Sequence, residues 1–306
     1  MRDRVVFKPG HTACAGCGQS MAVRLVLEAA GPNTIVANNT GCLEVFSTRY
    51  PESAWGVPWI HSLFENAAAV ASGIESALVY LGKKEGINVI AQAGDGGTAD
   101  IGLQALSGMW ERGHDILYVC YDNEAYMNTG IQRSGLTPFD SATTTSPSGR
   151  QSFGNIRPKK PMPEIALAHG IPYVATASAG FALDLQKKVK KAFSIKGPKY
   201  LQIHVPCPLG WRHEPNLTLA VAKCAVETGL YPLIEFEGGV LVARRQIAPK
   251  PVEEYLKMQG RFKHLLNAPE EIKKIQEIAD NNIRKYNLKA ETQTESSSKN
   301  SQNLTQ

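Results

Sequence analysis

The chain has 306 residues, of which 43% are hydrophobic, so it is long enough to bury one large α/β core. Its 33 basic and 28 acidic residues give a net charge of +5, a mild balance that indicates ordinary solvated surface and no nucleic-acid partner. No run of about eighteen apolar residues predicts a membrane span, and six cysteines without a signal peptide favour a reducing, cytoplasmic location over a secreted disulfide scaffold.

In chain order, the predicted elements alternate between helix and strand. Apolar residues at helical spacing predict helices, and short apolar runs predict strands. The predicted helices are 19–30, 61–81, 98–112, 163–169, 180–195 and 217–227, and the predicted strands are 34–37, 87–93, 116–121, 173–175 and 200–204. This alternation favours an α/β fold with a mostly parallel sheet flanked by helices.

We expect residues 1–249 to form one α/β domain that carries the functional site. Within it, 137–163 is rich in Thr, Ser, Pro and Gly, and is predicted to be a functional loop or an interface arm in which Phe153 and Arg157 touch a partner. Residues 250–288 have apolar side chains at helical spacing, which predicts a helical extension that packs on a partner or covers the core. Residues 289–306, rich in Ser, Gln and Asn from 291 on, are predicted to be disordered.

Gly94-Asp95-Gly96-Gly97 follows the predicted strand 87–93 and predicts a phosphate and magnesium site. We expect the glycines to allow positive φ and a close approach of phosphate, and a helix beginning near Thr98 to direct free N–H groups at it. The Asp95 carboxylate, the Asn123 amide oxygen and the backbone carbonyl of Ala125 would then bind Mg²⁺. Gly-Asp-Gly alone is also ordinary turn chemistry, but with Asn123 downstream the pattern resembles the thiamin diphosphate motif.

Four of the six cysteines lie in predicted loops. Cys14 and Cys17 form a Cys-x-x-Cys pair, Cys42 follows a strand, and Cys207 is flanked by prolines. Four thiolates suit a [4Fe-4S] cluster, whereas a structural zinc site more often uses two close pairs and a redox dithiol needs only the Cys-x-x-Cys. The remaining two, Cys120 and Cys224, are predicted to be core thiols.

Taken together, these motifs resemble the β subunits of 2-oxoacid:ferredoxin oxidoreductases, most closely those of the pyruvate synthase type. The resemblance runs from about residue 8 to residue 265 and is carried by 10–18, Cys42, 94–96, 122–130 and 206–208. It implies a thiamin diphosphate-binding fold in which Gly94, Asp95, Gly96, Gly97, Asn123, Ala125 and Cys42 bind the cofactor, and Asp95, Asn123 and Ala125 hold its Mg²⁺. It also implies that Cys14, Cys17, Cys42 and Cys207 hold a [4Fe-4S] cluster and that Asn128 faces the bound 2-oxoacid.

The resemblance further implies an enzyme that is active only with partner subunits. A 2-oxoacid would be converted with coenzyme A to acyl-CoA and CO2, its electrons passing through the cluster to ferredoxin, or the reverse synthesis would run. The catalytic glutamate would come from an α subunit, so this chain alone should be inactive. The absence of ferredoxin-type cysteine runs places further clusters on other subunits, γ and δ or their equivalents.

Alternatives remain open within this family and outside it. The substrate could be pyruvate, a branched-chain 2-oxoacid, 2-oxoglutarate or oxalate, because much of the pocket is expected on the partner. A thiamin decarboxylase or a transketolase-like enzyme would share the Gly-Asp-Gly motif but has no need for four loop cysteines. A structural zinc protein is the reading from a different class, in which the Gly-Asp-Gly is only a turn.

Overall fold

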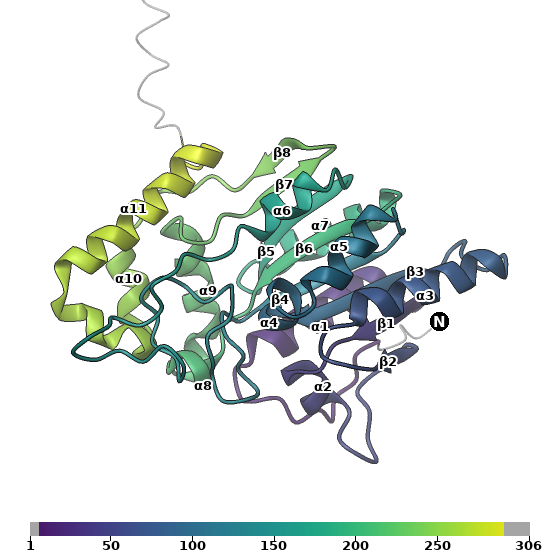
Figure 1. Ribbon diagram of the computed structural model, residues 1–306, viewed down its shortest axis with the longest axis horizontal. Coiled ribbons are helices and arrows are strands. Elements are labelled where there is room, and N and C mark those ends of the chain that lie inside the picture. The colour runs from purple at the N-terminus through teal and green to yellow at the C-terminus, as the bar shows by residue number, and fades with distance from the viewer. Residues whose placement is uncertain (1–5, 291–306) are drawn as a thin grey trace, which may run out of the picture.

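An eight-stranded sheet forms the centre of the molecule, of which the computed structural model describes residues 6–290 (Figure 1). The strand order is β2-β1-β3-β4-β6-β5-β7-β8, in which the first six strands are parallel and β7 and β8 are antiparallel to their neighbours. The strands are β1 Thr34–Asn38, β2 Trp59–His61, β3 Asn88–Gly94, β4 Leu117–Asp122, β5 Tyr173–Ser178, β6 Lys199–His204, β7 Ile234–Glu237 and β8 Val240–Arg244.

Helices cover both faces of this sheet, so the predicted α/β class and the mostly parallel sheet are confirmed (Figure 1). The helices before the C-terminal segment are α1 Gly18–Ala30, α2 Cys42–Ser47, α3 Ala67–Tyr80, α4 Asp95–Ala99, α5 Leu103–Glu111, α6 Met162–Ala168, α7 Ala182–Ser194, α8 Pro208–Trp211 and α9 Thr218–Glu227. One core packs α1 and α7 on the sheet, and a second packs α3, α5 and α6. Alternate residues of β3 serve the two cores, since Ile90 belongs to the first and Val89 to the second.

The C-terminal segment folds onto the chain itself. It contains α10 Val252–Lys257, a 3-10 helix Gly260–Asn267 and α11 Pro269–Tyr286, which run along one side of the molecule (Figure 1). Their apolar side chains join Trp211, α9 and β7 in a third core. The predicted helical extension is therefore present and covers the core of its own chain.

Two predicted helices differ from the structure. His61, predicted to begin the helix 61–81, is the last residue of β2, because 59–61 pair with β1 and the buried alanines of the helix begin only at Ala67. The predicted helix 98–112 is divided into α4 and α5 around Gly102, where an added Cβ would lie 2.0 Å from the Gly97 carbonyl oxygen.

Other short elements gave no clear pattern in the sequence. The strands β7 and β8 and the helices α2 and α8 were not predicted. All five residues of β8 are at least partly exposed, so it lacks an apolar alternation, and α8 has only four residues. Tertiary pairing defines such elements more than local preference does.

The predicted loop 137–163 contains neither helix nor strand up to Pro161, which is the N-cap residue of α6. Asn155 lies inside it and orders it, since its side-chain nitrogen donates to the carbonyls of Thr137 and Arg157, both at 2.8 Å. Beyond the last described residue lies 291–306, so its predicted disorder falls outside the structure. Lys289, at the start of the segment predicted to be disordered, forms a bridge with Ile247. No helix among the described residues is long and apolar enough to cross a membrane.

Candidate cofactor and cluster site

The two predicted cofactor-binding loops leave neighbouring parallel strands. β3 pairs with β4 so that Gly94 lies opposite Tyr121, which brings Asp95 and Asn123 to the same edge of the sheet. This edge is formed by the carboxyl ends of the strands, where open α/β sheets bind ligands. The helix after β3 begins at Asp95 and not near Thr98 as predicted, since the Thr98 hydroxyl already donates to the Gly94 carbonyl at 2.8 Å within its first turn.

Three oxygen atoms from these loops face one another. The side-chain oxygen of Asn123 lies 2.9 Å from Asp95 Oδ1 and 2.8 Å from the Ala125 carbonyl oxygen. Such a group is repulsive unless the amide turns to donate or a cation lies between the oxygens. Oxygens that share an octahedral Mg²⁺ at 2.0–2.1 Å are separated by about 2.9 Å, so these two distances suit a bound Mg²⁺ as well as hydrogen bonds from a turned Asn123 amide.

The Asp95 carboxylate is buried, with 1% of its surface exposed. Burial raises its pKa well above the usual range, and the charge of Asp122 raises it further. The Ser134 hydroxyl donates to Asp95 Oδ2 and opposes this shift. Ser134 was not identified from the sequence, because nothing local links it to a residue 39 positions earlier. A bound cation is the natural partner of so deeply buried a carboxylate.

The glycines of this loop are needed for space and not for positive φ. Gly94 has a φ of −72°, and Gly96 and Gly97 lie within α4, so the predicted positive φ is wrong. A Cβ on Gly96 would lie 2.2 Å from the Tyr126 ring, and one on Gly97 would lie 2.8 Å from Asn39 Nδ2. A Cβ on Gly94 would meet no atom within 4 Å. Gly94 therefore borders open space, while the other two let neighbouring loops pack closely.

A cavity of about 130 Å³ lies above these loops. All the residues predicted to bind the cofactor line it, as does Asn128. Its lining includes Cys42, Gly94, Asp95, Gly96, Gly97, Asn123 and Ala125. The sequence pattern therefore located residues that the fold brings together in one hollow.

The four cysteines predicted to bind a cluster line a second cavity, of about 170 Å³. Cys14 and Cys17 precede α1, and Cys207 is the N-cap of α8. Cys42 is the first residue of α2, so the prediction that all four lie in loops is wrong for this one. The other two thiols, Cys120 and Cys224, are buried in the cores as predicted.

The geometry of the cysteine cavity fits a cluster better than a single ion. Among residues 6–290, no three His, Cys, Asp or Glu side chains come close enough to share one metal ion. Tetrahedral zinc with four thiolates at 2.3 Å would hold the sulfurs only about 3.8 Å apart. A four-iron cubane separates its thiolates more widely and needs a chamber between them, such as this cavity.

Burial raises the pKa of Cys17, Cys42 and Cys207, so these three thiols are protonated in the metal-free protein. Burial raises the pKa of Cys42 to about 12, and the neighbouring Cys207, Cys17 and Cys14 raise it further. Burial likewise raises the pKa of Cys207 to about 11, against the backbone N–H of Gly210, which donates to its sulfur at 3.4 Å. Metal binding would release these protons.

The two cavities meet at a common wall. Gln19, Cys42, Asn123 and Asn128 line both of them. A group in the first cavity and a cluster in the second would therefore be separated by single side chains. The sequence could not indicate this adjacency, because the four residues come from three segments up to 109 positions apart (128 − 19).

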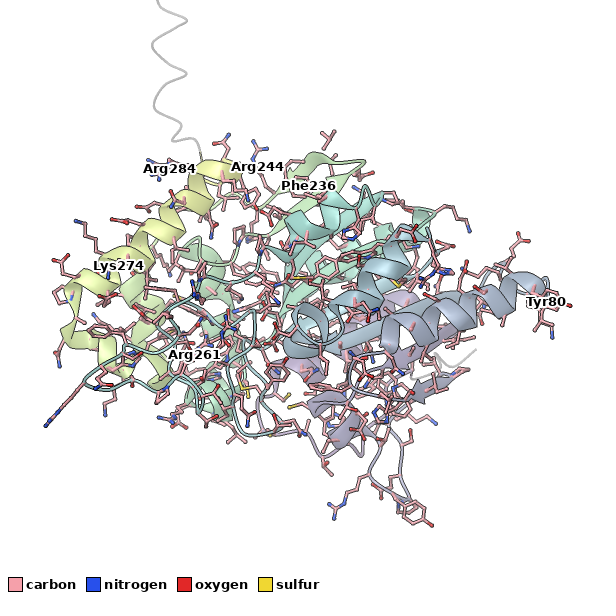
Figure 2. The ribbon with its side chains drawn as sticks, in the orientation of Figure 1. Tyr80, Phe236, Arg244, Arg261, Lys274 and Arg284 are labelled. Atoms are coloured by element: carbon pink, nitrogen blue, oxygen red, sulfur yellow. The ribbon has the colours of Figure 1, made fainter. Side chains whose placement is uncertain are left out.

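A buried ionic network centred on Glu124 holds the loop that contains Asn123. Glu124 has a positive φ of 69° and pairs with Lys159 Nζ at 2.8 Å and Arg261 Nη2 at 2.5 Å. Arg261, from the C-terminal segment (Figure 2), also stacks on Trp211, with its Cζ 3.8 Å from the ring centre. Burial raises the pKa of Glu124, but the charges of Lys159 and Arg261 outweigh it and hold the pKa well below its usual value. None of these roles was identified from the sequence.

Gln19 was also overlooked, although the sequence carries a signal for it. The buried face of α1 contains Gln19, Ala22, Val23, Val26, Leu27 and Ala30. A polar side chain in an otherwise apolar helical stripe is the exception that marks a candidate functional residue.

Comparisons with known proteins agree with this geometry. Residues 39–203 match the thiamine pyrophosphate enzyme, C-terminal TPP binding domain. The chain is 60% identical to pyruvate synthase subunit PorB of Methanosarcina barkeri, over 91% of this chain and 96% of the relative. It is 57% identical to the same subunit of Methanocaldococcus jannaschii, over 90% and 94% of the two chains.

A third relative has another substrate in its name. Ketoisovalerate oxidoreductase subunit VorB of Pyrococcus abyssi is 50% identical, over 85% of this chain and 86% of the relative. Among solved structures, the 2-oxoglutarate:ferredoxin oxidoreductase from Magnetococcus marinus superposes with a TM-score of 0.56 at 23% identity, over 71% of this chain and 79% of that one. At this identity the likeness supports the fold alone, and it confirms the predicted thiamin diphosphate-binding fold.

Proposed function

Because this chain belongs to the β subunits of the 2-oxoacid:ferredoxin oxidoreductases, which are thiamin diphosphate enzymes, we propose that its complex acts on pyruvate. We also propose that the chain carries Mg²⁺ and a [4Fe-4S] cluster beside the thiamin cofactor. The observation that carries this proposal is the common wall of the two cavities. One cavity has a diphosphate-type loop and a three-oxygen group, and the other has four cysteines. A decarboxylase or a structural zinc protein has no use for that adjacency.

Each group of residues has a distinct role in the proposal. Asp95, Asn123 and the Ala125 carbonyl bind Mg²⁺ and thereby fix the diphosphate. Gly94 leaves room for the phosphates. Asn128, which is exposed on the lining of both cavities, contacts the 2-oxoacid.

The cluster ligands complete the site. Cys14, Cys17, Cys42 and Cys207 hold the four irons; Cys14 is exposed and the other three thiols are partly buried. When bound, thiamin diphosphate supplies the electron sink for loss of CO2 from the 2-oxoacid. The common wall would separate that chemistry from the cluster by single side chains.

Partner subunits are part of this proposal. We propose that an α subunit supplies the glutamate that acts on the cofactor and that γ and δ subunits, or their equivalents, pass electrons to ferredoxin. Coenzyme A is the second substrate. The exposed apolar side chains near the cysteine cavity, such as Leu209 and Leu217, are 68% and 37% exposed and provide apolar area for such contacts.

The test is anaerobic co-purification with the partner subunits, followed by assays of a panel of 2-oxoacids with coenzyme A and a viologen dye. We expect dye reduction with pyruvate and none by this chain alone. Faster reduction with branched-chain 2-oxoacids would move the assignment toward the VorB type. If a complex that contains iron fails to reduce the dye with every 2-oxoacid of the panel, the proposed function is wrong.

A further inference from the structure

One of the four residues on the common wall has no role in the proposed function. Cys42 is a cluster ligand there, Asn123 a magnesium ligand, and Asn128 a substrate contact. Gln19 lines both cavities with them, yet it is neither a metal ligand nor part of a recognised motif.

The Gln19 side chain is buried, with 4% of its surface exposed. Its amide oxygen has no hydrogen-bond partner among residues 6–290. The other buried residues of α1 nearby are apolar, including Ala22 and Val23. A buried acceptor without a donor is unfavourable, and an apolar side chain would satisfy this position better in the empty protein. The amide is therefore expected to have a partner that fills one of the cavities.

The chemistry of the two proposed ligands selects between the cavities. Sulfide and thiolate sulfurs of an iron–sulfur cluster accept hydrogen bonds and cannot donate them. The unpaired Gln19 amide oxygen needs a hydrogen-bond donor, so its partner must lie in the first cavity and not in the cysteine cavity. Thiamin diphosphate carries an amine, and the keto oxygen of the 2-oxoacid becomes a hydroxyl when it is protonated.

We propose, on the premise of the proposed function, that Gln19 binds the organic ligand of the first cavity by accepting a hydrogen bond from an N–H or O–H group of the cofactor or the reacting substrate. Gln19 and Asn128, both on the common wall, then both contact the ligand of the first cavity. The first turn of α1 links this contact directly to the cluster, because Cys17 is the N-cap of the same helix.

The experiment uses the assembled complex with the Gln19→Met variant, since methionine matches the length of glutamine without its amide. Three quantities are measured: the Kd of thiamin diphosphate with Mg²⁺, the Kd of an acetylphosphonate analogue of pyruvate, and the midpoint potential of the clusters. Loss of one buried hydrogen bond corresponds to about a tenfold weaker Kd. A weaker Kd for the cofactor assigns the donor to its amine, and a weaker Kd for the analogue alone assigns it to the substrate hydroxyl.

Gln259→Met is the matched control for folding. Gln259 is also buried, but its amide is paired, since Arg261 Nε donates to it at 2.9 Å and it donates to the Tyr255 carbonyl at 2.9 Å. We expect Gln259→Met to lower the Tm of the cofactor-free chain and Gln19→Met to leave it unchanged or raise it. A purely structural role for Gln19 predicts the same lowering in both variants.

The outcomes separate the inference from its premise. If the wild-type complex binds neither the cofactor nor the analogue, the proposed function itself fails. If the wild type binds both and Gln19→Met binds them equally well, the function stands and the role of Gln19 is wrong. A change in the cluster potential with both Kd values unchanged also overturns it, because the amide would then serve the cluster as a donor.

Discussion

The indole N–H of Trp211 donates to the backbone carbonyl of Asn123 at 2.8 Å. Four residues before Trp211 is Cys207, whose carbonyl accepts the Trp211 backbone N–H at 2.9 Å. One side chain therefore ties the loop of a proposed magnesium ligand to the loop of a proposed cluster ligand. Arg261 stacks on the Trp211 ring and brings the C-terminal segment into the same unit.

Replacing Trp211 with Phe should remove this tie while keeping most of the ring packing. We expect a loss of about 1 kcal/mol of unfolding free energy beyond the loss from the smaller ring, and weaker binding of thiamin diphosphate. Trp110→Phe is the matched control, since Trp110 is also buried but its indole N–H has no partner among the described residues. Urea unfolding of both variants measures the difference. Equal losses would mean that the hydrogen bond contributes nothing.

Changing Asp95 to Asn should have opposite effects on folding and on binding. Burial raises the Asp95 pKa, so its charge is unfavourable in the metal-free chain, and Asn should leave stability unchanged or increase it. The same change removes the only carboxylate of the three-oxygen group and should reduce Mg²⁺-dependent cofactor affinity by more than about a hundredfold. Titration calorimetry on the assembled complex checks the second effect. Asn123→Ala should act in the same direction but more weakly, because an amide oxygen carries less charge.

Cys207→Ala and Cys42→Ala should each remove or damage one four-iron cluster. We expect about four fewer irons per copy of this chain in the complex, with the low-temperature EPR signal of that cluster lost. Cys120→Ala and Cys224→Ala are controls, since both thiols lie in apolar cores away from the cysteine cavity. A wild-type iron content and signal in Cys207→Ala would contradict the four-ligand site and favour a dithiol.

Gly96 and Gly94 should respond differently to alanine. Gly96→Ala places a Cβ 2.2 Å from the Tyr126 ring and should cost about 1–3 kcal/mol of stability, because the ring must shift. Gly94→Ala meets no protein atom and should be nearly neutral for stability, but its methyl group enters the first cavity. We expect it to weaken cofactor binding instead. Thermal unfolding without cofactor and titration with cofactor together distinguish the two effects, and a destabilised Gly94→Ala would be inconsistent with this geometry.

Asp115 gives a pH-dependent contribution to stability far from the site. Burial raises the Asp115 pKa, but Lys199 at 2.5 Å and then Lys84 at 3.0 Å outweigh it and lower the pKa to about 2. A depressed carboxyl pKa stabilises the fold above the unfolded pKa of about 3.9, and this contribution disappears as the pH falls toward 2. After allowance for solvent screening, Asp115→Asn should cost about 1 kcal/mol at pH 7.

The measurement for Asp115 is urea unfolding of both proteins at several pH values. The difference between wild type and Asp115→Asn should be constant from pH 7 to about 5 and should shrink below about pH 4. A difference that persists unchanged at the lowest pH where the chain folds would show that the effect is not due to the charge.

The amino-acid sequence determined the chemistry and the location of the main site residues. Asp95 and Asn123 follow strands that short apolar runs predict, and parallel pairing necessarily brings the ends of such strands to one edge. Four cysteines outside the cores were equally visible, because residue type alone distinguishes candidate metal ligands. Helix α1 and the strands β1, β3, β4 and β6 were predicted to within about two residues, since their apolar patterns are strong.

Only the tertiary structure decided which of these groups share a wall and what supports them. Arg261 pairs with a residue 137 positions away, and Ser134 with one 39 positions away, so no local pattern reports either contact. The positive φ predicted for the glycines of the loop is wrong, and the space that Gly96 and Gly97 provide depends on Tyr126 and Asn39, which other loops bring in. Edge strands and the four-residue α8 also follow from pairing and packing rather than from propensity. The role inferred for Gln19 rests on the same long-range information, since only the tertiary structure shows that this amide is buried and lines both cavities.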